Sequence, residues 1–363
     1  MLSSFRSLIV GCSALLLLAQ ASSAAADQPA EIRIANPGVG AGNRPFVGSS
    51  TAATMHLKGL LEEEFRKDGI KVTWTFLRGA GPAVNELYAN GLVDFSLLGD
   101  LPSIVGRASG LKTRVLAATG IRQNTYLAVP TESSVQSIKD LKGKRLAIFK
   151  GTNIQLAVAK LLEASGLTEG DIRAINMDTA TAKAALITKD VDAAFGGSDL
   201  LPLRDQGAVR IVYNTAGDPR FLRHASWVGS ESFIQKYPEI TKRVVKTLVA
   251  AAKWQSDNEV NPAPVFQLWT KSGFTFASYK EDNKGQSLKV LSSPLLDTYV
   301  LSQYKRQVAD AQRFGLIKKT FDVDSWFEPR FLNEAIKELN LTSFWQPVDA
   351  SGQVPQLAAA GAR

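Results

Sequence analysis

Short apolar runs alternate with amphipathic stretches along most of the chain, which is typical of an α/β fold. The apolar runs predict strands, and the stretches with helical spacing of apolar residues predict helices. Strands are expected at residues 31–35, 71–77, 93–98, 114–119, 125–129, 145–149, 172–177, 191–195 and 210–213. Helices are expected from a cap at 49–51 to about residue 67, at 79–90, from residue 99, and at 153–165, 179–189, 242–253 and 297–314.

The predicted elements fall into two similar sets. The stretch 90–96, with Asp94 before a buried strand, is paralleled by 189–195, with Asp192 in the same place. We therefore expect two Rossmann-like α/β lobes joined by a hinge, and not a short tandem repeat. Residues 226–229 predict a return to the first lobe. The expected domains are lobe I (residues 27–122 plus 227–343, mostly helical after Phe233), lobe II (residues 123–226), and a loose, Gly/Ala/Gln/Pro-rich tail (residues 344–363).

Residues 1–26 have the features of a cleavable signal peptide. Arg6 precedes the apolar run Leu8–Ala19, and Ala24–Ala26 offers a small-residue cleavage site. A run of about 12 apolar residues is too short to span about 30 Å of hydrocarbon. Cys12 superficially fits a lipidation signal, but the apolar run continues after it. The expected location is the periplasm, because an exported chain that retains no cysteine suits that compartment.

Composition narrows the function. The chain has 363 residues, one cysteine, two histidines and a formal net charge of +8. Loss of Arg6 with the leader leaves 41 basic against 34 acidic residues, or +7. These charges are interleaved and accompany no nucleic-acid-binding motif, so we predict no nucleic-acid partner. So few cysteines and histidines argue against a disulfide framework and a metal centre, and we predict neither cofactor nor metal.

Enzyme signatures are also poor. The sequence has no nucleophile elbow, zincin motif, phosphate-binding P-loop or dinucleotide-binding fingerprint. His56 lies within a predicted helix and His224 near the predicted crossover between lobes, and both are interpreted as structural or exposed. We therefore predict a protein that is not an enzyme.

Four glycine turns join the carboxyl end of a strand to the amino end of a helix: 79–82, 99–102, 151–153 and 196–199. In open α/β sheets such ends line the ligand crevice, and free N–H groups there bind anions. Each turn alone equally suits an ordinary strand–helix connection. Asp100 is read as a cap or hinge anchor more readily than as a ligand contact. Thr152 and Asn153 can cap a helix or donate to a ligand, while Arg44, Arg78 and Lys150 either meet an anionic group or are solvated.

The chain resembles the periplasmic solute-binding proteins of ABC importers, in particular the nitrate/sulfonate/taurine family. The resemblance covers about residues 30–255 and is carried by the segments 76–82, 85–95, 99–102, 140–147, 150–153, 191–194 and 230–238. It implies a type II periplasmic binding protein that closes around its ligand by hinge bending. Relatives that bind thiamine precursors carry a cysteine-rich motif, which is missing here.

The resemblance also implies a set of ligand-binding residues. These are Asn36, Gly40, Arg44, Ser49, Ser50, Arg78, Gly79, Gly81, Gly99, Asp100, Leu101, Lys150, Thr152, Asn153, Gly197, Ser198, Asp199 and Trp227. Many relatives carry a large aromatic residue where Gly196 and Gly197 stand here. Their small size either enlarges the pocket or changes which side chain covers the ligand, and Trp227 either compensates or belongs to the core. The segment 269–293 is longer than usual, and its role is left open.

The implied function is a monomeric receptor that passes a small organic anion to an ABC permease. An alkane- or arylsulfonate is the favoured ligand. The alternative ligands are nitrate, a sulfate ester and an aromatic carboxylate. The alternative classes of protein are a sensor domain without a transport role and an enzyme of the pyrimidine-synthesis type that shares the fold. The enzyme alternative requires a reactive histidine or cysteine in the cleft, and it fails if neither His56 nor His224 reaches the cleft.

Overall fold

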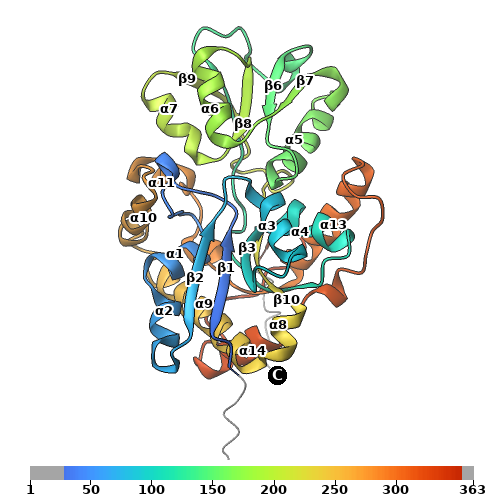
Figure 1. The fold of residues 1–363 in the computed structure, drawn as a ribbon. Coiled ribbons are helices and arrows are strands. Elements are labelled where there is room, and N and C mark those ends of the chain that lie inside the picture. Colours follow the sequence, from blue (N-terminus) through green and yellow to red (C-terminus); the bar gives the residue numbers. More distant parts are fainter. Residues whose placement is uncertain (1–27, 354–363) are drawn as a thin grey trace, which may run out of the picture.

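The computed structural model describes residues 28–353, so the predicted leader lies outside the described residues. The chain forms two lobes, each built around a five-stranded sheet (Figure 1). This arrangement confirms the predicted α/β class with two lobes. The residue limits given above for the lobes stay a prediction.

The first sheet has the strand order β2-β1-β3-β10-β4. Its bounds are β1 (Glu31–Asn36), β2 (Lys71–Phe76), β3 (Phe95–Gly99), β4 (Thr113–Ala118) and β10 (Ala225–Ser230). The chain leaves this sheet after β4 and returns as β10, which is antiparallel to both β3 and β4. The second sheet lies between these two events.

The second sheet has the strand order β7-β6-β8-β5-β9, with β7 and β9 at its edges. Its bounds are β5 (Tyr126–Pro130), β6 (Arg145–Ile148), β7 (Arg173–Asn176), β8 (Ala193–Gly196) and β9 (Val209–Asn214). In both sheets, therefore, one strand that enters from the other lobe is inserted antiparallel beside parallel strands.

The helices surround both sheets. Their bounds are α1 (Thr51–Leu57), α2 (Leu60–Phe65), α3 (Ala80–Ala89), α4 (Asp100–Ala108), α5 (Asn153–Ala164), α6 (Thr179–Thr188), α7 (Leu201–Asp205), α8 (Glu231–Lys236), α9 (Pro238–Asp257), α10 (Ala263–Trp269), α11 (Phe276–Asp282), α12 (Leu288–Leu291), α13 (Thr298–Arg313) and α14 (Arg330–Glu338). Short 3-10 turns are η1 (Ala41–Asn43), η2 (Arg66–Asp68), η3 (Ile138–Leu141), η4 (Glu169–Asp171), η5 (Ser198–Leu200), η6 (Thr270–Ser272) and η7 (Asp324–Trp326). Within residues 28–353, no helix has both the length and the apolar character needed to cross a membrane.

The similarity between the segments 90–96 and 189–195 corresponds to an ion pair that occurs once in each lobe. In the first lobe Asp94 accepts from the Arg33 backbone at 2.8 Å and pairs with its guanidinium at 2.6 Å. In the second lobe Asp192 accepts from the Arg145 backbone at 2.7 Å and pairs with its guanidinium at 2.9 Å. Each aspartate thus fixes the start of its strand to the neighbouring parallel strand.

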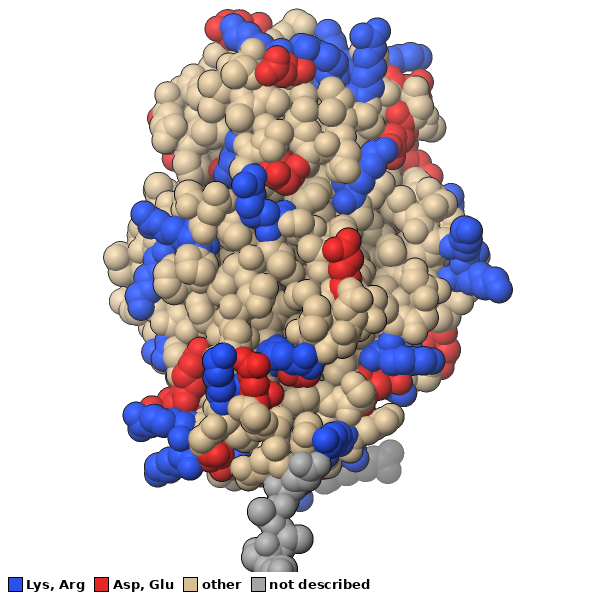
Figure 2. Space-filling view, viewed as in Figure 1, with Lys and Arg blue, Asp and Glu red and all other residues tan. Residues whose placement is uncertain are grey.

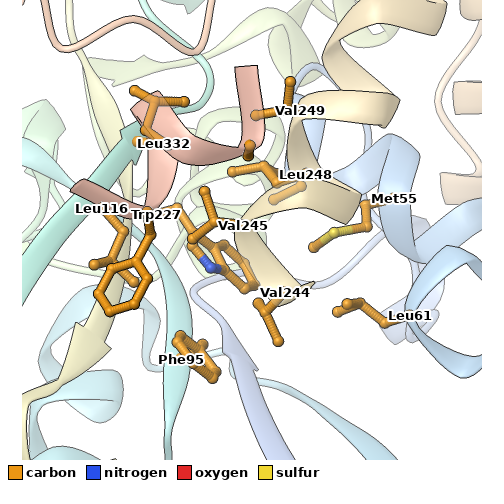
Figure 3. Close-up of a cluster of buried hydrophobic side chains, with 14 of the residues drawn as sticks. Met55, Leu61, Phe95, Leu116, Trp227, Val244, Val245, Leu248, Val249 and Leu332 are labelled. Atoms are coloured by element: carbon orange, nitrogen blue, oxygen red, sulfur yellow. The ribbon is translucent and has the colours of Figure 1, made fainter. Parts of the chain in front are cut away.

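Trp227 lies in the core of the first lobe and not in a cleft (Figure 3). Its ring stacks on Phe95, with centroids 6.0 Å apart and planes inclined by 7°. Val244, Val245 and Leu248 of α9 belong to the same buried cluster. The prediction that Trp227 lines the ligand site is therefore wrong, because this face of the central strand β10 turns toward α9.

Two further expectations need correction. The helix expected to run from Thr51 to Lys67 is broken at Gly59, whose φ of +64° is left-handed and ends α1 before α2 begins. The expected loose tail is packed over its described part: Trp345 is 3% exposed and donates to Ser256 at 3.0 Å. The buried apolar side chains of Trp345 and Val348 hold this stretch on the first lobe.

The two crossovers between the lobes run side by side. Gln123 and Arg223 exchange backbone hydrogen bonds of 2.9 and 3.0 Å in an isolated antiparallel bridge. The lobes also meet outside the crossovers, where Lys160 of α5 pairs with Asp310 of α13 at 3.6 Å and Arg204 of α7 pairs with Glu281 of α11.

Candidate ligand-binding cleft

A cavity of about 480 Å³ lies between the lobes, with walls from both. Twelve of the residues predicted from the sequence line it. They are Asn36, Gly40, Ser49, Ser50, Arg78, Gly81, Gly99, Thr152, Asn153, Gly197, Ser198 and Asp199. The carboxyl ends of β1, β3 and β8 carry most of these residues to one place, as expected for open α/β sheets. Their contact with a ligand stays a prediction.

The other predicted residues lie elsewhere. Lys150 pairs with Glu169 at 2.7 Å, Arg44 is exposed, and Leu101 is fully buried among apolar side chains. Gly79, at the start of α3, is absent from the cavity wall, as are Asp100 and Trp227. The sequence places these residues beside the correct loops, but the side chains of Arg44, Asp100, Leu101, Lys150 and Trp227 and the backbone at Gly79 do not line the cavity.

Asp100 joins three parts of the molecule instead of facing a ligand. Its carboxylate accepts from the Leu101 backbone at 2.7 Å, from the His224 backbone at 2.8 Å and from the Gln307 amide at 2.8 Å. Burial raises the pKa of Asp100 to about 6 against the opposing effect of these hydrogen bonds. The residue therefore links the start of α4 to the returning crossover and to α13.

The amino ends of the helices around the cavity differ in how their N–H groups are satisfied. Asp178 caps α6 by accepting from Ala180 at 2.9 Å and Thr181 at 3.0 Å. Thr152 precedes α5 but does not cap it, because its hydroxyl donates to the Phe149 carbonyl at 2.7 Å. The amino end of α5 is thus left without a side-chain acceptor, and Asn153 and Ile154 of its first turn line the cavity. Such an end attracts anions.

The two lobes approach closely beside this helix end. A Cβ atom at Gly99 of the first lobe would lie 3.1 Å from the Asn153 side chain, and one at Gly151 would lie 2.7 Å from Pro82. Small residues on both sides therefore allow the amino ends of α3 and α5 to face the same cavity.

The segment 269–293, whose role was open, supplies a wall that sequence reasoning missed. Phe274, Tyr279 and Asp282 line the cavity. The same segment supports the glycine-rich loop after β1: a Cβ at Gly40 would lie 2.2 Å from the Ser272 carbonyl oxygen, and one at Gly48 would lie 2.3 Å from the Tyr279 hydroxyl. The glycines of that loop are therefore partly explained by close packing on this segment.

Charged residues of both signs line the cavity. Arg78 pairs with Asp178 at 3.4 Å and Lys183 with Asp199 at 3.1 Å. Arg223 and Asp282, both unforeseen, also line it. On the outer surface, Figure 2 shows Lys and Arg interleaved with Asp and Glu over this face of both lobes.

The two histidines lie outside the cavity wall. His56 is packed among Phe46, Trp74 and Phe76, and burial lowers its pKa to about 4. His224 is 1% exposed, and burial lowers its pKa to about 3. Over the part of the chain that the structure describes, no group of three or more His, Cys, Asp or Glu is placed to hold a metal ion.

Comparison with known proteins agrees with this architecture. Residues 64–260, more than half of the chain, match the family model described as NMT1/THI5 like. A Bacillus subtilis protein named as binding aliphatic sulfonates is 28% identical over 77% of this chain and 83% of its own length. The crystal structure of a Methylobacillus flagellatus protein described as the periplasmic sulfonate-binding protein SsuA is 31% identical, with a TM-score of 0.73 over 88% of this chain and 97% of that one.

An enzyme shares the fold at lower identity. The desulfurization enzyme DSZB, solved with biphenyl-2-sulfinic acid, is 17% identical, with a TM-score of 0.63 over 85% of this chain and 99% of that one. At this identity the likeness concerns the fold alone.

The two lobes, their five-stranded mixed sheets and the cleft between them have the architecture of a type II periplasmic binding protein. Within that class, the chain belongs to the NMT1/THI5-like family, which confirms the family resemblance seen in the sequence.

Proposed function

We propose that the chain is the solute receptor of an ABC importer and that it captures an organic anion, with a sulfonate as the favoured ligand. The observation that carries this proposal is the cavity between the lobes, into which the amino end of α5 opens without a side-chain cap. Ligand bound there would contact both lobes and so shift the molecule toward its closed form.

The cavity suits a ligand with a charged, polar head and an apolar tail. Free N–H groups of α5 and the polar side chains of Ser49 and Asn153 supply donors for sulfonate oxygens. Val39, Val47, Leu97, Phe149 and Phe274 supply apolar wall. A cavity of about 480 Å³ has room for the organic part of such an anion beside its charged head.

The relatives support the same class of ligand. The Bacillus subtilis and Methylobacillus flagellatus proteins are both named for sulfonate binding, and their similarity extends over most of this chain. We accordingly propose delivery to an inner-membrane permease by a monomeric receptor, after export directed by residues 1–26.

The enzyme alternative is disfavoured by the side chains available. It required a histidine or cysteine in the cleft, but His56 and His224 lie outside the cavity wall. The single cysteine of the sequence is Cys12, within the proposed leader. The relatives found by sequence are binding proteins, and DSZB shares the fold only.

Calorimetry and thermal unfolding with a ligand panel test the proposal. The panel contains alkanesulfonates of increasing length, benzenesulfonate, the matched carboxylates, a sulfate ester and nitrate. At a ligand concentration of one hundred times Kd, the free energy of unfolding should rise by about 2.7 kcal/mol. Selective stabilisation by sulfonates supports the proposal. A preference for nitrate or a carboxylate would reassign the ligand, and no response to any anion would overturn it.

A further inference from the structure

Arg223 differs from the other cations that line the cavity. Its side chain is buried, with the whole residue 8% exposed. Arg78 and Lys183 each have a carboxylate partner, whereas Arg223 forms no ion pair within 4 Å among residues 28–353. The protein thus buries a guanidinium against the cavity without a direct countercharge.

The hydrogen bonds of Arg223 are directed at neutral groups. Its guanidinium donates to the hydroxyl of Thr125 at 2.9 Å, to the amide oxygen of Gln123 at 3.3 Å and to that of Asn153 at 3.2 Å. It also donates to the Asn124 carbonyl oxygen. These bonds hold the guanidinium rigidly between the outgoing crossover and the first residue of α5.

The carboxylates whose charges act on Arg223 are Asp100, Asp199 and Asp282, and each of them makes its short contacts with other groups. Asp199 pairs with Lys183, and Asp282 accepts from Tyr126 at 2.7 Å and from Asn124 at 3.0 Å. Asp100 is held by backbone and amide donors. Their charges attract Arg223 from a distance, while burial lowers the pKa of Arg223. A buried charge that lacks a close partner is costly, so an anion in the cavity would relieve that cost.

We propose that Arg223 binds the anionic head of the ligand, together with Asn153 and the amino end of α5. This inference rests on the proposed function and adds the residue that recognises the charge. Because Arg223 lies on the returning crossover and Asn153 on the second lobe, an anion between them also ties the hinge to that lobe.

The glycine at position 197 keeps this guanidinium accessible. A Cβ there would lie 3.6 Å from Arg223 Nη2, so a longer side chain would extend over the guanidinium. The φ of Gly197 is −93°, which any residue adopts, so a substitution brings no backbone strain. The small residue at this turn therefore leaves the proposed anion subsite open toward the cavity.

The main experiment measures calorimetric affinity for benzenesulfonate and for its neutral analogue benzenesulfonamide. Arg223→Met should weaken benzenesulfonate binding about thirtyfold or more, since removal of one buried charge partner has effects of this size. Arg223→Lys should retain part of the affinity. The matched control is Arg220→Met on the same crossover, where the exposed side chain pairs with Asp218 at 2.6 Å and the affinity should be unchanged.

The charge preference separates recognition from a structural role. Wild-type protein should prefer the sulfonate to the sulfonamide, and Arg223→Met should lose most of that preference. A general loosening of the cleft would instead weaken both ligands equally, and that result would overturn the inference.

A second variant guards against misfolding of Arg223→Met. Gly197→Leu leaves the arginine in place but covers it, and should weaken sulfonate binding about tenfold, the factor that corresponds to one charge-assisted hydrogen bond. Gly170→Leu, at an open surface position, is its control. If wild-type protein binds no sulfonate, the proposed function fails. If it binds and both Arg223→Met and Gly197→Leu bind within threefold of it, only the inference fails.

Discussion

The amino ends of α4 and α5 arise from the same local pattern but are put to different uses. Each helix follows a parallel strand, one in each lobe: α4 begins directly after β3, and α5 begins after the four residues 149–152 that follow β6. Gly99 before α4 lies beside Asn153 of α5. At α4 the carboxylate of Asp100 folds back and accepts from the next backbone N–H and from distant donors. At α5 the Thr152 hydroxyl turns away and leaves the helix end open.

The difference shows that a glycine turn before a helix does not by itself make an anion site. A carboxylate that returns to the helix end satisfies its donors and adds a negative charge, so the end becomes a structural junction. A hydroxyl that bonds elsewhere leaves the donors to a ligand. The two ends therefore predict opposite responses to mutation, one in stability and one in affinity.

The largest expected effect is a loss of folding stability when Asp100 is replaced at the amino end of α4. Asp100→Ala leaves three donors without an acceptor and should lower the free energy of unfolding by about 3 kcal/mol. Urea unfolding followed by circular dichroism measures this. The control Asp257→Ala, which removes an exposed carboxylate paired with Lys253, should cost less than about 0.5 kcal/mol. Equal losses in the two variants would contradict the junction role of Asp100.

The second-largest effect is expected on the affinity for the ligand, when Asn153 is replaced at the uncapped amino end of α5. Asn153→Ala removes an amide that lines the cavity and accepts from Arg223, and should weaken sulfonate binding about tenfold. The free energy of unfolding without ligand should change by less than about 1 kcal/mol. Calorimetry measures the affinity, with the exposed Asn333→Ala of α14 as control. An undiminished affinity would show that α5 does not face the ligand.

The stability that Asp100 contributes at the amino end of α4 should also depend on pH. The folded pKa of Asp100 is raised to about 6 from an ordinary 3.8, so between these values the folded state holds a proton that the unfolded chain has lost. The contribution of Asp100 to stability therefore falls as pH rises through this interval. The loss caused by Asp100→Asn should be about 2 kcal/mol greater at pH 4 than at pH 7. Urea unfolding at both pH values checks this, and an equal loss at each would argue against a raised pKa.

The smallest effect on ligand affinity is expected at Gly99, where the amino ends of α4 and α5 approach each other. A Cβ at Gly99 would lie 3.1 Å from the Asn153 side chain, and a φ of −64° imposes no backbone strain. Gly99→Ala should displace Asn153 by a few tenths of an ångström and weaken sulfonate binding about threefold, well below the tenfold of a lost hydrogen bond. Gly170→Ala should leave the affinity unchanged. A stronger effect than that of Asn153→Ala would mean that Gly99 itself is a principal contact.

Much of the fold was predictable because apolar periodicity and glycine turns are local signals. The sequence placed the strand at β10 as a return to the first lobe, and the structure agrees. The face of the sheet to which a given side chain points was harder to predict from the sequence. Trp227 was included among the ligand-binding residues as a substitute for an aromatic side chain at Gly196 or Gly197, but its side chain packs in the core with residues of α9. No local signal distinguishes the two faces of a strand that is covered on both sides.

The residues that were missed come from irregular or distant segments. Arg223 lies on a crossover without periodicity, and its burial depends on contacts with residues 123–125 and 153. Phe274, Tyr279 and Asp282 come from a C-terminal segment that meets the loop after β1 only in the folded chain. The unusual length of the segment 269–293 was the sequence signal for the last three residues, and no local signal pointed to Arg223.

The sequence by itself determined the α/β class, the two similar lobes and the loops that surround the cleft, because each depends on neighbours in the chain. The tertiary structure alone decided that Asp100 accepts hydrogen bonds at the amino end of α4, that the amino end of α5 has no side-chain cap, and that Arg223 is buried without an ion-pair partner within 4 Å among residues 28–353. Those outcomes depend on where donors and acceptors from distant segments meet, and such meetings are set by packing and not by local pattern.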